Sequence, residues 1–169
     1  MKFVKSKSCL FAVFVASSLV AVPVMAGGTH DHKHDSDMME FDPVDNEFGS
    51  YEDDMKVSRT IEIGMSDEMK FEPNVIKVKK GEVIAFVHEN HGQMMHEFVL
   101  GTGELLDEHA EMMKKFPNME HSEPYMSHVA PGKKGEMVWK FDKEGEFSFG
   151  CLIPGHYDAG MTGKVIVES

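Results

Sequence analysis

The sequence predicts an all-β fold: a Greek-key β-sandwich with one short inserted helix and a disordered N-terminal tail. From about residue 57 onward, short segments rich in branched and aromatic residues alternate with turn signals such as Lys80-Gly81, Pro131-Gly132 and Glu144-Gly145. About seven short strands at this spacing are typical of a sandwich of two sheets.

The expected strands can be placed along the chain by their apolar residues. The pattern is clearest where Met137, Trp139 and Phe141 alternate with polar neighbours, and where Phe147 and Phe149 do the same. We expect Trp139 to pack in the core. The predicted strands span residues 57–63, 71–79, 82–87, 95–100, 136–141, 145–150 and 163–167.

One segment has a helical pattern instead. Thr102 is a suitable helix cap, and Pro117 is a suitable stop. Between them, apolar residues recur at helical spacing, which predicts a helix over residues 103–115. The helix and the stretch that follows it, as far as His128, form a long connection within the sandwich. Such connections are usually functional.

The first 26 residues have the pattern of a cleaved secretory signal peptide. Three lysines precede a mostly apolar run, and Val24-Met25-Ala26 is a suitable cleavage site. The alternative is an uncleaved membrane anchor, but the run is short against the roughly 20 apolar residues that span a bilayer. We therefore expect export to the periplasm and no stable membrane insertion.

Residues 27–54 are rich in Gly, Asp, Glu and His, and we expect them to form a disordered tail before a domain at 55–169. In this tail His30, His32 and His34 alternate with charged residues. Short His-rich tracts bind Cu(II), Ni(II) or Zn(II), so the tail is a candidate for metal capture. The alternative is a solvated tail without a metal.

The composition limits the partners. The formal net charge of −12 argues against nucleic acid and anionic membrane surfaces, and it favours a soluble chain, with monomer as the default state. Cleavage of the signal would leave Cys151 as the single cysteine of the mature chain. An odd thiol in an oxidising compartment is either buried and inert or held by a metal.

The C-terminal loop carries three residue types that bind soft metals. Cys151, His156 and Met161 supply a thiolate, an imidazole and a thioether, and His96 can supply a second imidazole. Two histidines and one cysteine with a weak axial methionine are typical of a mononuclear, redox-active copper site. The alternatives are zinc, for which thioether is a poor ligand, and ordinary structural roles for these residues.

These motifs resemble those of the cupredoxins, in the plastocyanin/azurin family of type 1 copper proteins. Within that family the chain resembles the CopI-type periplasmic copper-tolerance proteins, in segments 70–73, 95–100, 109–112 and 151–161. The resemblance implies one type 1 copper. One departure is Glu97, where many members have Asn or Ser after the first ligand histidine. A carboxylate behind the copper ligands would alter the field around the sulfur, so a green site is as plausible as a blue one.

Further methionines and histidines suggest auxiliary copper binding. Thioether and imidazole together favour Cu(I). The candidates are Met94, Met119, His121, Met126 and His128. The alternative is that these methionines fill the core. For His88 and His109, a purely structural role is as plausible as metal binding.

Three functions fit this sequence. The first is copper tolerance, because an electron shuttle does not need extra metal-binding residues. The second is one-electron transfer, with the acidic surface steering a basic partner such as a periplasmic cytochrome. The third is an enzyme that oxidises Cu(I). It is the weakest, because the chain lacks the paired histidines of a trinuclear oxygen-reducing cluster.

Overall fold

The computed structural model describes residues 44–51, 55–117, 119 and 121–169. The predicted signal peptide, most of the predicted tail and His30, His32 and His34 lie outside these residues. The described residues contain the following elements: β1 (Val44–Asn46), β2 (Gly49–Tyr51), β3 (Arg59–Ser66), β4 (Lys70–Glu72), β5 (Val75–Lys79), β6 (Val83–Asn90), β7 (His96–Gly101), α1 (Gly103–Lys115), β8 (Met126–Val129), β9 (Lys134–Lys140), β10 (Gly145–Gly150) and β11 (Thr162–Glu168).

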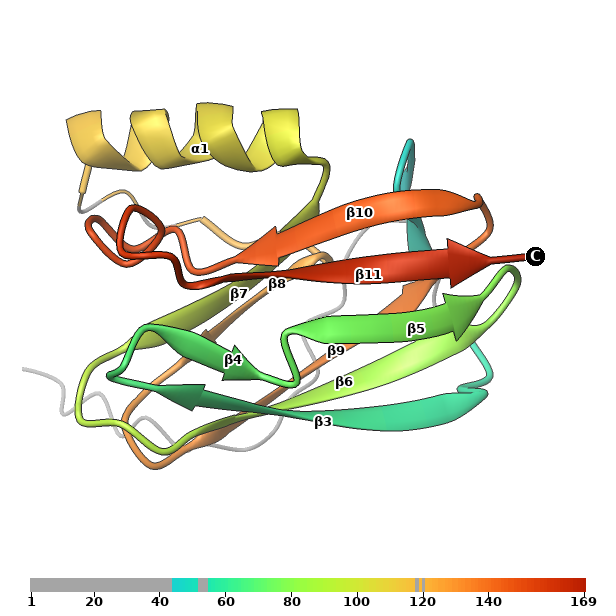
Figure 1. The fold of residues 1–169 in the computed structure, drawn as a ribbon, viewed down its shortest axis with the longest axis horizontal. Helices are drawn as coiled ribbons and strands as arrows, with labels where there is room; N and C mark the ends of the chain where they lie inside the picture. Colours follow the sequence, from blue (N-terminus) through green and yellow to red (C-terminus); the bar gives the residue numbers. More distant parts are fainter. Residues whose placement is uncertain (1–43, 52–54, 118, 120) are drawn as a thin grey trace, which may run out of the picture. The chain divides into compact units, whose positions relative to one another are not determined.

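The strands form two sheets, as the sequence predicted. One sheet has the order β1-β2-β9-β6-β3-β4, and the other has the order β5-β11-β10-β7-β8. Most neighbours are antiparallel, but β3 pairs in parallel with β6, and β5 pairs in parallel with β11. Figure 1 shows the sheets as two layers, with α1 next to β10 and β7.

Aromatic side chains fill the space between the sheets. Phe98 of β7 stacks on Phe149 of β10 at a centroid distance of 4.8 Å, and Phe71 meets both rings edge-on. Trp139 is fully buried, as expected. The alternation seen in the sequence therefore marks the inward faces of the strands.

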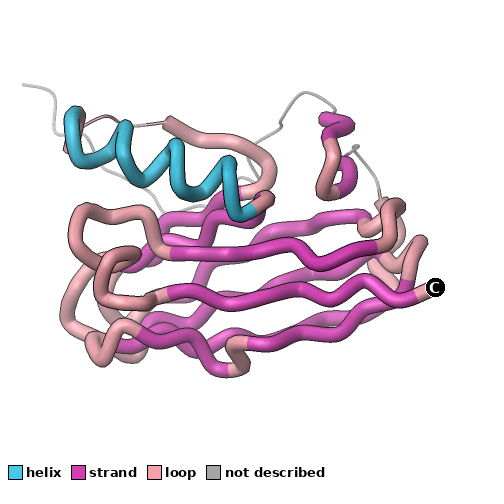
Figure 2. Tube along the Cα trace, turned by 45° about the horizontal axis from the view of Figure 1, so that its top comes forward, coloured by secondary structure: helices cyan, strands magenta, loops and turns pink. Residues whose placement is uncertain are grey.

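Strand β7 is buried on both faces. Phe98 and Leu100 point into the sandwich core, whereas Val99 belongs to a second apolar cluster with Leu106 of α1. The helix therefore covers the outer face of this strand (Figure 2). Because successive side chains of a strand point to opposite faces, His96 is directed to the sandwich side and Glu97 to the helix side.

The helix begins and ends where the sequence predicted. The Thr102 side chain accepts a hydrogen bond from the Leu105 N–H at 3.2 Å, and the helix ends before Pro117. Its buried residues are Leu106, Ala110 and Met113. No helix among the described residues is long and apolar enough to cross a membrane.

Three details of the predicted strands were wrong. The segment 71–79 is two strands, because the chain leaves one sheet after Glu72 and enters the other at Val75. Strand β8 was not predicted, since it is short and has few branched residues. The third error concerns residues 44–51, which were assigned to the disordered tail.

Residues 44–51 instead form a hairpin on the edge of the first sheet, where Ser50 pairs with Lys140. Phe48 fixes this hairpin. It is 1% exposed, stacks on Trp139 at 5.3 Å and accepts a hydrogen bond from the Trp139 Nε1–H at its carbonyl, at 3.0 Å. One buried aromatic residue thus gives a polar segment enough apolar contact to join the sheet.

Candidate metal centre

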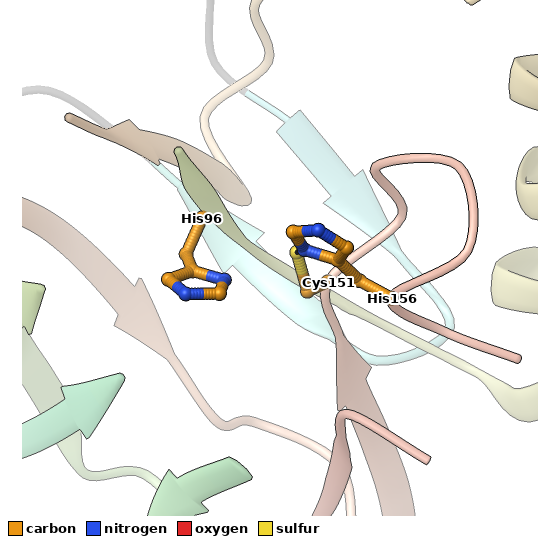
Figure 3. A group of neighbouring side chains, drawn as sticks. All are labelled: His96, Cys151 and His156. Carbon is orange, nitrogen blue, oxygen red and sulfur yellow. Dashed lines mark hydrogen bonds between the residues drawn. The ribbon is translucent and has the colours of Figure 1, made fainter. Parts of the chain in front are cut away.

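The start of β7 and the loop between β10 and β11 bring the candidate ligands together. His96 opens β7, Cys151 follows β10, and His156 lies in the turn that leads to β11. One ligand atom from each of the three lies within 4.8 Å of the others. Figure 3 shows the Cys151 thiol beside the His156 ring, with the His96 ring on the other side of the thiol.

Backbone hydrogen bonds close the loop that carries most of these residues. The Cys151 N–H donates to the Met161 carbonyl at 3.1 Å, and the Met161 N–H donates to the His156 carbonyl, also at 3.1 Å. Gly155 and Gly160 allow this tight path, with φ values of 91° and 93° that other residues rarely adopt. Met161 is fully buried in the same apolar cluster as Cys151.

The thiol is enclosed and hydrogen-bonded. Cys151 is fully buried, and burial raises the pKa of its thiol to about 12. Its Sγ accepts a hydrogen bond from the Glu97 N–H at 3.3 Å and lies 3.3 Å from His156 Nδ1. A metal cation is what would stabilise the thiolate at neutral pH.

His96 is oriented by Asp67, a residue that sequence reasoning missed. Asp67 Oδ1 lies 3.0 Å from His96 Nε2. The pKa of Asp67 is lowered, first by the hydrogen bond from the Gln93 N–H and also by that from His96, so this carboxylate is an acceptor. His96 Nε2 therefore carries the hydrogen, and Nδ1 keeps its lone pair.

The free nitrogen of His96 has the property expected of a ligand atom. Nδ1 is buried and has no hydrogen-bond partner among the described residues. Buried polar atoms are rarely left unpaired, so a metal bound at this position would satisfy it. Burial, together with the nearby His96, lowers the pKa of His156, which favours the neutral, metal-binding form.

Glu97 lies on the opposite side of β7 from this cluster. Its carboxylate is buried, and Oε2 accepts a hydrogen bond from the Leu152 N–H at 3.2 Å. Oε1 is 2.9 Å from Nε2 of His128. The sequence predicted that Glu97 lies behind the copper ligands and affects the field at the sulfur. Its direct contact with Cys151 is made by the main-chain N–H, which donates to Sγ.

The auxiliary candidates do not form one group. Met94 and Met119 are exposed, at 40% and 37%, whereas Met126 is buried beneath α1. His121 and His128 are closer, with ring centroids 6.4 Å apart. His121 also contacts His109, which the sequence did not favour as a ligand.

The fold and the His96–Cys151–His156 cluster define a cupredoxin, a β-sandwich that holds copper between its end loops. Residues 55–168 match the model of the family described as "Copper binding proteins, plastocyanin/azurin family". The chain belongs to this family, and its cofactor is copper.

Relatives agree with this assignment. The chain is 43% identical to the "Copper-resistant cuproprotein CopI" of Rubrivivax gelatinosus, over 93% of this chain and 95% of that one. It is 33% identical to the protein of the same name from Pseudomonas aeruginosa, over 72% and 82%. The fold resembles an auracyanin of Roseiflexus castenholzii, with a TM-score of 0.58 and 20% identity over 68% of this chain and 100% of that one.

Proposed function

We propose that this protein is a periplasmic copper-tolerance protein that binds one type 1 copper through His96, Cys151, His156 and Met161. The observation that carries the proposal is the clustering of three ligand atoms with His96 Nδ1 unpartnered and buried. Two relatives carry "Copper-resistant" in their names. Copper bound at such a site supplies one-electron redox chemistry.

Each residue of the proposed site has a separate role. Cys151 supplies the thiolate, and its N–H···S contact with Glu97 stabilises negative charge on the sulfur. His96 and His156 supply neutral nitrogens, with His96 held in the required tautomer by Asp67. Met161, buried in the same loop, supplies the weak axial sulfur.

The test is a titration of the mature chain with Cu(II), recorded by visible absorption. We expect an intense thiolate-to-copper band that is absent from Cys151→Ala and unchanged in His91→Ala, a control histidine in an exposed turn. A copper-sensitive bacterial host that expresses the protein should tolerate more copper than one that expresses Cys151→Ala. Equal tolerance would refute the physiological part of the proposal, and a missing band would refute the site.

Electron transfer is the second candidate, and the formal charge of −12 favours it. An acidic surface increases the rate of encounter with a basic partner, and salt weakens that effect. Rapid electron exchange with a basic periplasmic cytochrome that slows steeply with salt, together with unchanged copper tolerance, would favour this candidate instead.

A further inference from the structure

Helix α1 contacts the loop that carries three of the four proposed copper ligands. We call residues 151–161, which join β10 to β11 and contain Cys151, His156 and Met161, the ligand loop. Figure 1 shows this loop beside α1. The helix contacts the ligand loop at three residues, and each of them follows a ligand by one or two positions.

The first contact is apolar and comes directly after Cys151. Leu152 is 1% exposed and belongs to the same apolar cluster as Leu106, Ala110 and Met113. These three residues are the buried face of α1. Because full burial of a leucine side chain is strongly stabilising, this contact fastens the start of the ligand loop to the helix.

The second contact is made by Tyr157, the residue after His156. Its hydroxyl donates a hydrogen bond to Asp107 of α1 at 2.9 Å. Its ring lies so close to Gly150 of β10 that a Cβ added there would be 2.9 Å from two ring carbons. Tyr157 is therefore held by the helix at its hydroxyl and by the sheet along its ring.

The third contact is an ion pair between the helix and the ligand loop. Nζ of Lys114 in α1 lies 2.9 Å from Oδ1 of Asp158, and the two side chains are 38% and 57% exposed. An exposed pair of this kind contributes little to folding stability. Lys114 and Asp107 lie about two turns apart along α1, so the helix holds two successive loop residues at two separate points. Together these contacts restrict both the position and the orientation of the turn that carries His156.

His156 is the ligand whose position depends most on these contacts. The His156 N–H donates to the Ile153 carbonyl at 3.0 Å, which fixes the shape of the turn but not its place on the sandwich. Cys151 and Met161 are fully buried, whereas His156 is half-buried. Of the residues of the ligand loop that are proposed to bind the metal, His156 can therefore move away most readily.

We propose that α1 restrains His156, with Asp107 and Lys114 as positioning residues, and thereby controls how fast copper leaves the site. A metal held by several ligands dissociates only after one ligand has moved away. Movement of His156 requires the two residues that follow it to move, which breaks both polar contacts with the helix. The choice of metal rests on the proposed function, but the restraint itself is a property of the metal-free chain.

The first measurement uses the metal-free protein and needs no copper. Amide hydrogen exchange at His156, whose N–H is hydrogen-bonded within the ligand loop, reports local opening of that loop. In the double variant Asp107→Ala/Lys114→Met, we expect exchange to be roughly 5- to 30-fold faster, because a charge-assisted hydrogen bond and an ion pair are lost. The matched control is Glu108→Ala/Lys115→Met, at neighbouring exposed residues of the same helix. Both double variants leave the net charge unchanged.

The second measurement is the rate at which the copper-loaded protein loses metal to an excess of a strong chelator. We expect Asp107→Ala/Lys114→Met to lose copper faster than the control by a similar factor, with the thiolate band retained. Lys114→Arg keeps the ion pair and should restore the wild-type rate. Tyr157→Phe removes the hydroxyl but not the ring, and it should add no further acceleration to Asp107→Ala, because both changes remove the same hydrogen bond.

Equal exchange rates at the ligand loop in the test and control variants would overturn the proposal. Faster exchange without faster loss of copper would also overturn it, since the restraint would then not control release. A control variant without a thiolate band is a different result. It would refute the proposed copper site, while the exchange rates of the metal-free proteins would still decide whether α1 restrains the ligand loop.

Discussion

The carboxylate of Asp67 contacts Nε2 of His96 at 3.0 Å, although the two residues are 29 positions apart in the sequence. The same carboxylate accepts hydrogen bonds from the N–H groups of Gln93 and Met94, at 2.7 and 3.3 Å. Asp67 therefore fixes both the ring of His96 and the turn that leads into β7.

Replacement of Asp67 should weaken copper binding without removing a ligand. In Asp67→Ala, His96 loses the acceptor that selects its tautomer, and we expect copper affinity to fall by roughly 10- to 100-fold. Competition with a copper chelator measures the change. Glu68→Ala, at a neighbouring exposed carboxylate, is the control and should keep wild-type affinity. Equal affinities for both variants would contradict this role of Asp67.

Gly92 offers a test that leaves the Asp67 carboxylate in place. A Cβ at Gly92 would lie 1.9 Å from Asp67 Oδ1, so Gly92→Ala must displace that side chain. We expect the same direction of change in copper affinity as for Asp67→Ala. Gly103→Ala is the matched control, since a Cβ there meets no atom within 4 Å. A wild-type affinity in Gly92→Ala would show that the position of Asp67 is unimportant.

Glu97 should lower the reduction potential of the copper. Glu97→Gln keeps an oxygen that can accept from the Leu152 N–H but removes a buried negative charge near the sulfur. A nearby negative charge stabilises the oxidised metal more than the reduced metal, because the oxidised metal carries more positive charge. Removal of the charge should therefore raise the reduction potential by tens of millivolts, which corresponds to a free-energy change on the order of 1 kcal/mol. Potentiometric titration measures this, with the exposed Glu104→Gln as control. A fall in potential would contradict the electrostatic explanation.

His88 should make folding sensitive to acid. Burial between Phe86 and Phe98 lowers its pKa to about 3, and neither ring nitrogen has a hydrogen-bond partner among the described residues. Above the unfolded pKa of about 6.5 the ring is neutral in both states. As the pH falls below that value only the unfolded state gains the proton, so stability falls by up to about 1.4 kcal/mol per pH unit until the pH approaches 3.

Chemical denaturation of the metal-free protein between pH 4 and 8 measures this effect, because copper ligands also titrate when the metal is present. His88→Leu should reduce the loss of stability below pH 6.5. His91→Leu, at an exposed histidine, should leave the slope unchanged. Parallel pH profiles for wild type and His88→Leu would rule out His88 as the cause.

Phe48 should stabilise the domain from outside its predicted boundary. Phe48→Ala removes a fully buried ring that stacks on Trp139, and we expect the free energy of unfolding to fall by about 3–5 kcal/mol. Thermal or denaturant unfolding measures this. Val57→Ala, at a residue that is 39% exposed, should cost far less. Similar losses in the two variants would mean that the hairpin is not part of the core.

Local signals explain what could be predicted from the sequence. The cap at Thr102 and the alternation around Trp139 are contained in short segments, and the helix and the strand predicted from them were confirmed. The spacing from Cys151 to His156 is also local, and the structure brings both residues close to His96. The outcome was different where a residue's role depends on a distant partner. Phe48 requires Trp139, which lies 91 residues away.

The site shows the same limit. His96 and Cys151 could be named from their motifs, and they do meet. Asp67 lies in a polar turn that resembles many others, so no local pattern separates it from its neighbours. His109 occupies one position of a helical stripe, and only the return of the chain beneath α1 brings His121 to it.

The burial of Cys151 also has a consequence for the protein before it meets copper. A thiol with a pKa near 12 and no exposed surface hardly forms the thiolate that oxidants and other disulfides attack. In the periplasm, the compartment proposed above, a chain without metal would therefore keep Cys151 chemically inert. The thiol then loses its proton when copper binds, and oxidation of the free thiol does not compete with this step.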